Sequence, residues 1–217
     1  MVKTVVLRCL QVFAIAFALS CLTTLAAQES DDSSAMLTSL NPTPTSPGAA
    51  VASDLPDVAM ETADGTRTSF AASGGRVRIT TMFYSHCPGV CPLTIEALRG
   101  IDRQLTAEQR AKLSFVLLSL DPAHDSPQTL RALAVERGLT STQWPSSRWI
   151  IGRTSEADAR SFATAAHIHY RTLSDGSIDH SSALVLVDER GRVLSRVSDE
   201  ADSAEFVAAT RRALDQQ

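Results

Sequence analysis

Residues 77–92 read VRITTMFYSHCPGVCP, and this stretch decides the fold that we expect. Its first part, 77–84, combines β-branched and aromatic side chains and predicts a buried strand. Cys87 and Cys91 follow, and apolar residues then recur at helical spacing through 92–105. Both cysteines precede a proline, which biases them toward extended backbone, so we expect the regular helix to begin at the first residue of 92–105. The stretch therefore predicts a strand that passes into a helix through a turn carrying two cysteines.

Before this stretch, Asp64 and Gly65 predict a turn between two short extended segments, and after it the chain alternates extended and helical segments. Apolar runs and turn signals predict strands, and capping residues with helical periodicity predict helices. The expected strands are 114–120, 148–151, 183–187 and 192–197, and the expected helices are 127–137, 155–166 and 202–214. This order predicts an α/β domain with a mixed central sheet flanked by helices, compatible with a thioredoxin-like fold. Periodicity alone does not select that fold among other mixed-sheet arrangements.

Composition excludes several classes of protein. The chain has 217 residues and a formal net charge of −4, so it lacks the basic footprint of a nucleic-acid-binding protein. Aromatic residues make up 5% of the chain, which argues against a base-stacking platform. Four cysteines are too few for a scaffold built from disulfides. We therefore expect no nucleic-acid partner.

Residues 1–27 predict an export signal. Two basic residues precede an apolar run at 12–22, and small residues follow it. That run is shorter than the roughly 20 residues of a membrane-spanning helix. The segment is either cleaved, retained as a membrane anchor, or acylated at Cys21, because 18–21 (ALSC) loosely match a bacterial lipobox. In each case the rest of the protein is expected to be exported, to the periplasm or the intermembrane side.

Residues 28–56 predict a flexible linker. They are rich in Ser, Thr, Pro, Ala and Asp and contain no Lys or Arg, so they cannot bury enough apolar surface to offset the entropy of ordering. Residues 57–217 are then expected to form one domain. Because the leader holds the other two cysteines, this domain retains only Cys87 and Cys91.

Three interpretations of this cysteine pair remain open. The pair forms a structural disulfide, acts as a redox-active dithiol, or binds a metal. A helix N-terminus stabilises a thiolate, which suits the last two, although thioredoxins space their cysteines by two residues and Cys87 and Cys91 are spaced by three. Two thiolates alone are an incomplete metal site. Sulfur selects copper(I), an added imidazole also permits copper(II), and zinc would need a fourth ligand.

His180 is the histidine whose context best suits a ligand. It precedes the expected strand 183–187, which places it on a loop at a sheet end, where ligands of α/β domains gather. Asp179 or Ser181 would orient its ring. From this context alone, a surface histidine or one that only hydrogen-bonds its own loop remains the alternative.

Other histidines are expected to lie away from the cysteines. His86 adjoins Cys87. On a strand, however, the side chain of His86 would point to the face opposite that of Cys87. His167 and His169 follow an expected helix and should face solvent.

Three motifs together resemble the Sco/SenC family: 83–92 (FYSHCPGVCP), 121–127 (DPAHDSP) and 179–181 (DHS). The resemblance covers 57–217, with the motifs in the family's order and spacing. It implies a thioredoxin-like fold, and copper, as Cu(I) or Cu(II), bound by Cys87, Cys91 and His180. It also implies a metallochaperone that helps to assemble the dinuclear copper centre of cytochrome c oxidase, with the copper-accepting oxidase subunit, or another copper or thiol protein, as partner.

Two other functions stay open beside this one. In the first, Cys87 and Cys91 are the catalytic pair of a thiol–disulfide oxidoreductase that acts on cysteines of a partner protein. In the second, the protein signals copper or redox state.

The chain also departs from the family, which usually has Asp at the position of Gly89 and Thr at that of Ser126. The missing carboxylate should alter the thiol pKa values, the copper affinity or the choice of partner, whereas Ser126 still caps a helix.

Overall fold

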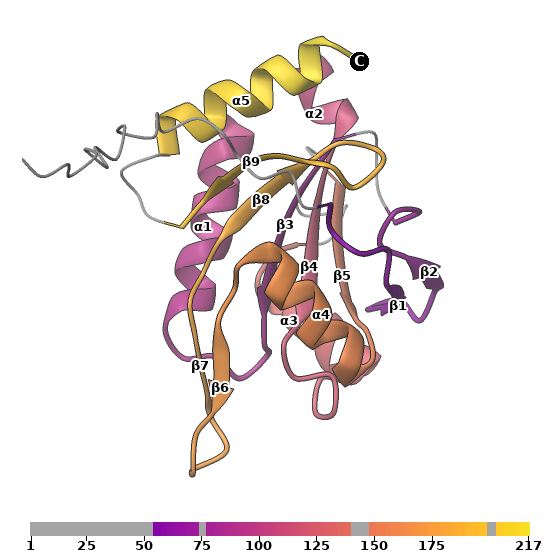
Figure 1. Cartoon of the computed structure of the whole chain (residues 1–217), viewed down its shortest axis with the longest axis vertical. Coiled ribbons are helices and arrows are strands. Elements are labelled where there is room, and N and C mark those ends of the chain that lie inside the picture. Colours follow the sequence, from indigo (N-terminus) through magenta and orange to yellow (C-terminus); the bar gives the residue numbers. More distant parts are fainter. Residues whose placement is uncertain (1–53, 74–76, 140–147, 199–202) are drawn as a thin grey trace, which may run out of the picture. The chain divides into compact units, whose positions relative to one another are not determined.

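The structure is a computed structural model that describes residues 54–73, 77–139, 148–198 and 203–217 (Figure 1). The leader expected at 1–27 lies outside the described residues, and so does the linker expected at 28–56 apart from its last three residues. Cleavage, lipidation and membrane attachment of these segments therefore stay predictions. In the part of the chain that is described, no helix combines the length and the apolar character needed to cross a bilayer.

A mixed sheet forms the centre of the described chain, as the alternation of elements predicts (Figure 1). Its order is β2-β1-β5-β4-β3-β8-β9. The central strands β3, β4 and β5 run parallel, and the outer strands pair antiparallel. The bounds are β1 Ala59–Thr62, β2 Arg67–Ser69, β3 Val77–Phe83, β4 Leu113–Ser119, β5 Arg148–Arg153, β8 Leu184–Val187 and β9 Val193–Val197.

Helices flank this sheet and confirm the α/β class (Figure 1). All residues of β3 and β4 are buried, because parallel central strands are covered on both faces. The helices are α1 Val90–Arg103, α2 Ala107–Lys112, α3 Pro127–Glu136, α4 Glu156–Ala166 and α5 Ser203–Asp215. The fold is thioredoxin-like.

Helix α1 begins at Val90, so the start expected at Pro92 is wrong by two residues. The first backbone N–H groups of a helix have no partner within it, so a proline in the first turn, such as Pro92, costs the helix no backbone hydrogen bond. The bias that a proline places on the residue before it is overridden at Cys91. As a result Cys91 lies on the helix, while Cys87 lies in the turn before it.

Two features of the fold were absent from the sequence prediction. One is α2, a short helix begun by a capping box between Thr106 and Gln109. The other is a separate two-stranded sheet, formed by β6 (Tyr170–Thr172) and β7 (Ile178–His180). His180 was expected on a loop and is instead the last residue of β7. Strands of three mostly exposed residues carry too little periodicity to be recognised.

Candidate metal centre

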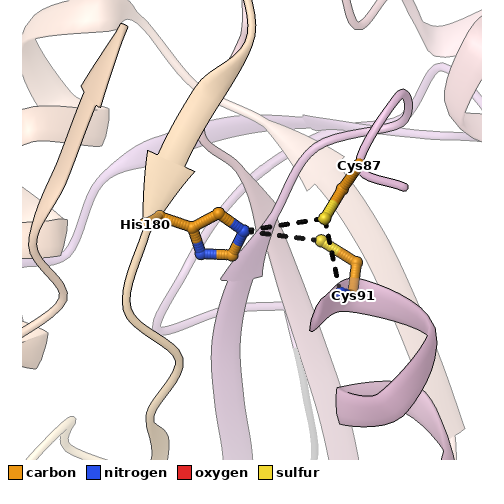
Figure 2. A group of neighbouring side chains, drawn as sticks. All are labelled: Cys87, Cys91 and His180. Carbon is orange, nitrogen blue, oxygen red and sulfur yellow. Dashed lines mark hydrogen bonds between the residues drawn. The ribbon is translucent and has the colours of Figure 1, made fainter. Parts of the chain in front are cut away.

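Cys87, Cys91 and His180 converge on one point, as Figure 2 shows. The Nε2 atom of His180 lies 3.8 Å from the Sγ atom of Cys87 and 3.7 Å from that of Cys91. All three ligand atoms lie within 4.8 Å of one another. Within the described residues, this group of Cys, His, Asp and Glu donors contains only these three. The structure thus brings together the residues that the sequence singles out, and their role as ligands stays a prediction.

Three separate elements supply the donors. The turn after β3 holds Cys87, whose N–H donates to the carbonyl of Tyr84 at 3.2 Å. The first turn of α1 holds Cys91, whose N–H donates to the Sγ of Cys87 at 3.4 Å. The β6–β7 hairpin holds His180, which pairs with Tyr170 in register. A helix N-terminus, a strand end and a hairpin therefore fix the three donors relative to one another.

The two thiols are free and nearly enclosed. Cys87 is 9% exposed and Cys91 is 6% exposed, while His180 is half-buried. Solvent therefore meets the imidazole more readily than the sulfur atoms. Such enclosure disfavours a thiolate charge unless hydrogen bonds or a cation compensate it.

The environment separates the pKa values of the two thiols. Burial acts to raise the pKa of Cys87, but hydrogen bonds from the Cys91 thiol, His180 and the N–H groups of Cys91 and Gly89 outweigh it, so the pKa falls to about 7. Burial raises the pKa of Cys91, and its hydrogen bond with Cys87 raises it further. Cys87 is consequently the thiol that ionises first, and Cys91 donates to it.

The backbone orients the imidazole of His180. Its Nδ1 lies 3.0 Å from the carbonyl oxygen of Ser181. A carbonyl can only accept, so Nδ1 carries a proton and Nε2 is the ring atom that faces the thiols. With a second proton Nε2 donates to the Cys87 thiolate, and without it Nε2 offers the lone pair that a metal ligand requires. The expectation that Asp179 or Ser181 orients the ring is therefore confirmed for Ser181, which acts through its backbone carbonyl and not its side chain. Asp179 pairs with Arg171 at 3.0 Å, and the Ser181 hydroxyl accepts from the N–H of His169.

Tyr84 completes the wall of the site and was missed in the sequence. Its ring meets that of His180 edge-on, with centroids 5.8 Å apart. The side chain is buried, and this burial raises the pKa of the phenol. The sequence held one signal, an aromatic residue three positions before Cys87 at the end of a strand. Tyr84 therefore restricts the ring of His180 and shields the thiols.

Asp125 also turns toward this part of the fold. Its neighbour Ser126 caps α3, as predicted, by accepting from the N–H of Thr129 at 3.1 Å. The carboxylate of Asp125 is completely buried and accepts from the N–H of Ser85 and the hydroxyl of Ser119. It thereby links the second sequence motif to the first.

The remaining histidines considered above lie outside the group. His86 is exposed, as are His167 and His169, which confirms that they face solvent. The reason given for His86 is wrong, because it lies in a turn and not on a strand, and its Nδ1 is 2.8 Å from the hydroxyl of Ser85.

The family model for SCO1/SenC matches residues 58–215. The chain belongs to the SCO1/SenC family. A Stutzerimonas stutzeri protein, provisionally named as copper-binding, is 34% identical over 128 residues, which are 57% of this chain and 58% of that protein. The chain thus spans little more than half the length of that relative.

Solved structures share the fold of this SCO1/SenC protein. Arabidopsis thaliana ScoI with copper bound gives a TM-score of 0.61 at 18% identity and covers 76% of this chain and 100% of that one. BsSco, described as a member of the Sco family of cytochrome c oxidase assembly proteins with a disulfide switch, gives 0.62 at 18% identity and covers 77% and 96%. Both likenesses support the thioredoxin-like fold.

The donor set fits copper on chemical grounds. Thiolate sulfur favours copper(I), and an added imidazole allows copper(II) as well. Zinc usually completes a tetrahedron with a fourth donor, and within the described residues this group offers three. The three atoms also sit close enough to contract onto one ion, since metal–sulfur and metal–nitrogen bonds are about 2.0–2.3 Å long.

Proposed function

We propose that this SCO1/SenC protein binds one copper ion through Cys87, Cys91 and His180 and delivers it to a copper-accepting subunit of cytochrome c oxidase. The observation that carries the proposal is the convergence of two free thiols with the Nε2 of His180, at 3.8 and 3.7 Å. The Nε2 atom of the imidazole is already directed at the sulfur atoms. Little rearrangement is then needed to close the site around an ion.

Transfer would proceed by ligand exchange. An acceptor thiolate replaces one donor of the bound ion at a time, so the ion changes hands without becoming free and without a change of oxidation state. The half-buried His180 is the donor most open to solvent, and it is neutral, so it is the one that an incoming ligand displaces first. Two relatives support copper transfer to the oxidase: the Arabidopsis protein has been solved with copper bound, and BsSco is described as a cytochrome c oxidase assembly protein.

The place of action is part of the proposal. The expected leader at 1–27 would carry the domain across a membrane, and the expected linker at 28–56 would let it reach an acceptor there. The acceptor would then lie on the periplasmic or intermembrane side. The fate of the leader, cleaved, retained or acylated at Cys21, does not alter the chemistry of the site.

The unequal thiols favour a second function, thiol–disulfide exchange. With its pKa at about 7, the Cys87 thiolate would attack a disulfide of the partner and release one partner thiolate. Cys91 would then displace the second partner sulfur and close the Cys87–Cys91 disulfide. Two electrons pass from this pair to the partner's disulfide, which becomes two thiols. Copper plays no part in this reaction, so His180 is not needed as a ligand and contributes only its hydrogen bond to the Cys87 thiolate.

Two variants, His180→Ala and His169→Ala, distinguish copper transfer from disulfide reduction as the function of the protein. Copper(I)-loaded protein is mixed without oxygen with the purified copper-binding domain of the oxidase subunit, and copper on each protein is measured after separation. The same variants are tested for reduction of a disulfide in that domain. His180→Ala removes the third donor, and His169→Ala is its matched control, an exposed histidine beside the same hairpin.

Delivery of copper predicts that His180→Ala loses transfer while His169→Ala behaves as the unaltered protein. If His180→Ala transfers copper at the unaltered rate, the proposal is contradicted. If the unaltered protein transfers no copper but it and both variants reduce the disulfide, oxidoreductase activity is the function.

A further inference from the structure

Asp125 lies in the second sequence motif, in the loop between β4 and α3, and among the described residues none of its hydrogen bonds goes to Cys87, Cys91 or His180, although its charge helps to raise the pKa of Cys91. It is nevertheless one of the most enclosed acidic residues, with no exposed surface. A buried carboxylate is costly unless it accepts several hydrogen bonds. The hydrogen-bond partners of the Asp125 carboxylate therefore indicate its structural role.

The partners of Asp125 lie just beyond β3 and at the end of β4, the two strands that lead toward the site. The N–H of Ser85 donates to both carboxylate oxygens, at 3.3 and 3.2 Å. The hydroxyl of Ser119, the last residue of β4, donates to Oδ2 at 2.5 Å. Ser119 also accepts from the N–H of Asp121 at 2.9 Å, which fixes the loop that carries the carboxylate. The carboxylate is thus a clamp between the ends of β3 and β4.

Ser85 lies inside the turn that ends at Cys87. The turn is closed by the hydrogen bond from the N–H of Cys87 to the carbonyl of Tyr84 at 3.2 Å. The next bond in the series runs from the N–H of Cys91 to the Sγ of Cys87. Anchoring the N–H of Ser85 therefore fixes the turn, and the turn fixes the sulfur of Cys87 against α1 and His180.

We propose that Asp125 is the positioning residue of the thiol site, because its buried carboxylate holds the Ser85 end of the turn and so sets where Cys87 meets Cys91 and His180. It acts through hydrogen bonds and not as a ligand. An acceptor of the same shape without charge retains most of this role. The part of the proposal that concerns copper rests on the proposed function, and the part that concerns the free thiols does not.

Three variants test this role. Asp125→Ala removes the clamp, and Asp125→Asn keeps an acceptor oxygen in nearly the same place. Asp188→Asn is the matched control, because Asp188 is also buried and accepts backbone N–H groups, from Arg190 and Arg192. It follows β8, whose Val187 pairs with Arg78 near the start of β3, so it lies a strand length from the site.

Two readouts are taken on protein shown to be folded by circular dichroism at 25 °C. The first is the equilibrium of the Cys87–Cys91 pair with reduced and oxidised glutathione in copper-free protein, which reports how well the two sulfurs are held together. The second is copper(I) affinity in competition with a chelator. Loss of a supporting hydrogen bond lowers metal affinity by about tenfold or more.

We expect Asp125→Ala to disfavour the disulfide severalfold and to weaken copper(I) binding by about tenfold, with Asp125→Asn close to the unaltered protein and Asp188→Asn unchanged. A folded Asp125→Ala with unaltered values in both measurements overturns the proposal, and so does Asp125→Asn as impaired as Asp125→Ala. If Asp125→Ala does not fold, Ser119→Ala replaces it, and an unaltered glutathione equilibrium there counts against the clamp. If the unaltered protein binds no copper, the proposed function fails, while the glutathione result still decides the role of Asp125.

Discussion

The Nε2 atom of His180 lies 3.7 Å from the Sγ atom of Cys91, although 89 residues separate the two in the sequence. One belongs to the β6–β7 hairpin and the other to the first turn of α1. A bound ion would therefore join the hairpin to the helix that follows β3. The hairpin forms a small sheet of its own, so we expect the bound ion to stabilise it against local opening more than it stabilises the central sheet.

Copper(I) should accordingly slow amide hydrogen exchange in the β6–β7 hairpin more than elsewhere. A ligand that binds only the folded arrangement stabilises it by mass action, and local opening of the hairpin would have to release the ion. Hydrogen exchange followed by mass spectrometry, with and without one equivalent of copper(I), measures this effect. In His180→Ala the hairpin should show no added protection. Equal protection of the hairpin in that variant would argue against the link.

Alkylation of Cys87 should depend on pH with a midpoint near 7. The thiolate is the reactive form, and the pKa of Cys87 is lowered to about 7, so the rate rises with pH through this value and then levels off. Cys91, whose pKa is raised, should stay largely unmodified over the same range. Iodoacetamide labelling with fragment-ion mass spectrometry assigns each site. A midpoint near the ordinary thiol value of 9.0 would contradict the arrangement of hydrogen bonds described above.

Gly89→Asp should restore the family's usual residue without harming the fold. A Cβ atom at this position meets nothing within 4 Å, and the φ of −118° suits any residue. The new carboxylate would lie between the two thiols in sequence, and its negative charge should raise the pKa of Cys87. The alkylation midpoint should therefore move to higher pH. Gly89→Asn, of the same shape but uncharged, should leave the midpoint near 7; a shift of equal size in both variants would rule out a charge effect.

Gly152→Ala should destabilise the sheet. An added Cβ would lie 2.6 Å from the Cε of Met60 and 3.0 Å from the carbonyl oxygen of Glu61, and the backbone oxygen cannot easily give way. Such overpacking costs about 1–3 kcal/mol in the free energy of unfolding. Gly100→Ala on α1 is the opposite control, with its nearest neighbour at 3.9 Å, and should stabilise by up to about 1 kcal/mol. Urea unfolding measures both, and a Gly152→Ala protein as stable as the parent would contradict the packing.

The sequence predicted those parts of the fold whose signals are local and strong. The apolar runs of β3 and β4 allow few structures other than covered strands. The Ser126–Pro127 pair was enough to predict the start of α3, because the serine caps the helix and the proline suits its first position. The same kind of reasoning placed the start of α1 two residues late, since a proline within the first turn of a helix gives no sign of where the helix begins.

The site could be predicted only in part, because much of its support is not local. The cysteines and His180 were found from residue type, motif and resemblance. The roles of Tyr84 and Asp125 depend on contacts between residues far apart in sequence, such as Ser85 and Asp125, which are 40 positions apart. The partner of the His180 ring is the backbone carbonyl of Ser181; the sequence could name this residue as a neighbour but not the atom, because every residue has a carbonyl.

The most direct test of the copper site is an anaerobic titration of the fully reduced protein with copper(I) in the presence of a competing chelator. The unaltered protein should bind one equivalent, and His169→Ala should match it. Cys87→Ser should abolish stoichiometric binding, and His180→Ala should weaken it by at least about tenfold. One equivalent bound by Cys87→Ser with unaltered affinity would contradict the assignment of this group as the copper site.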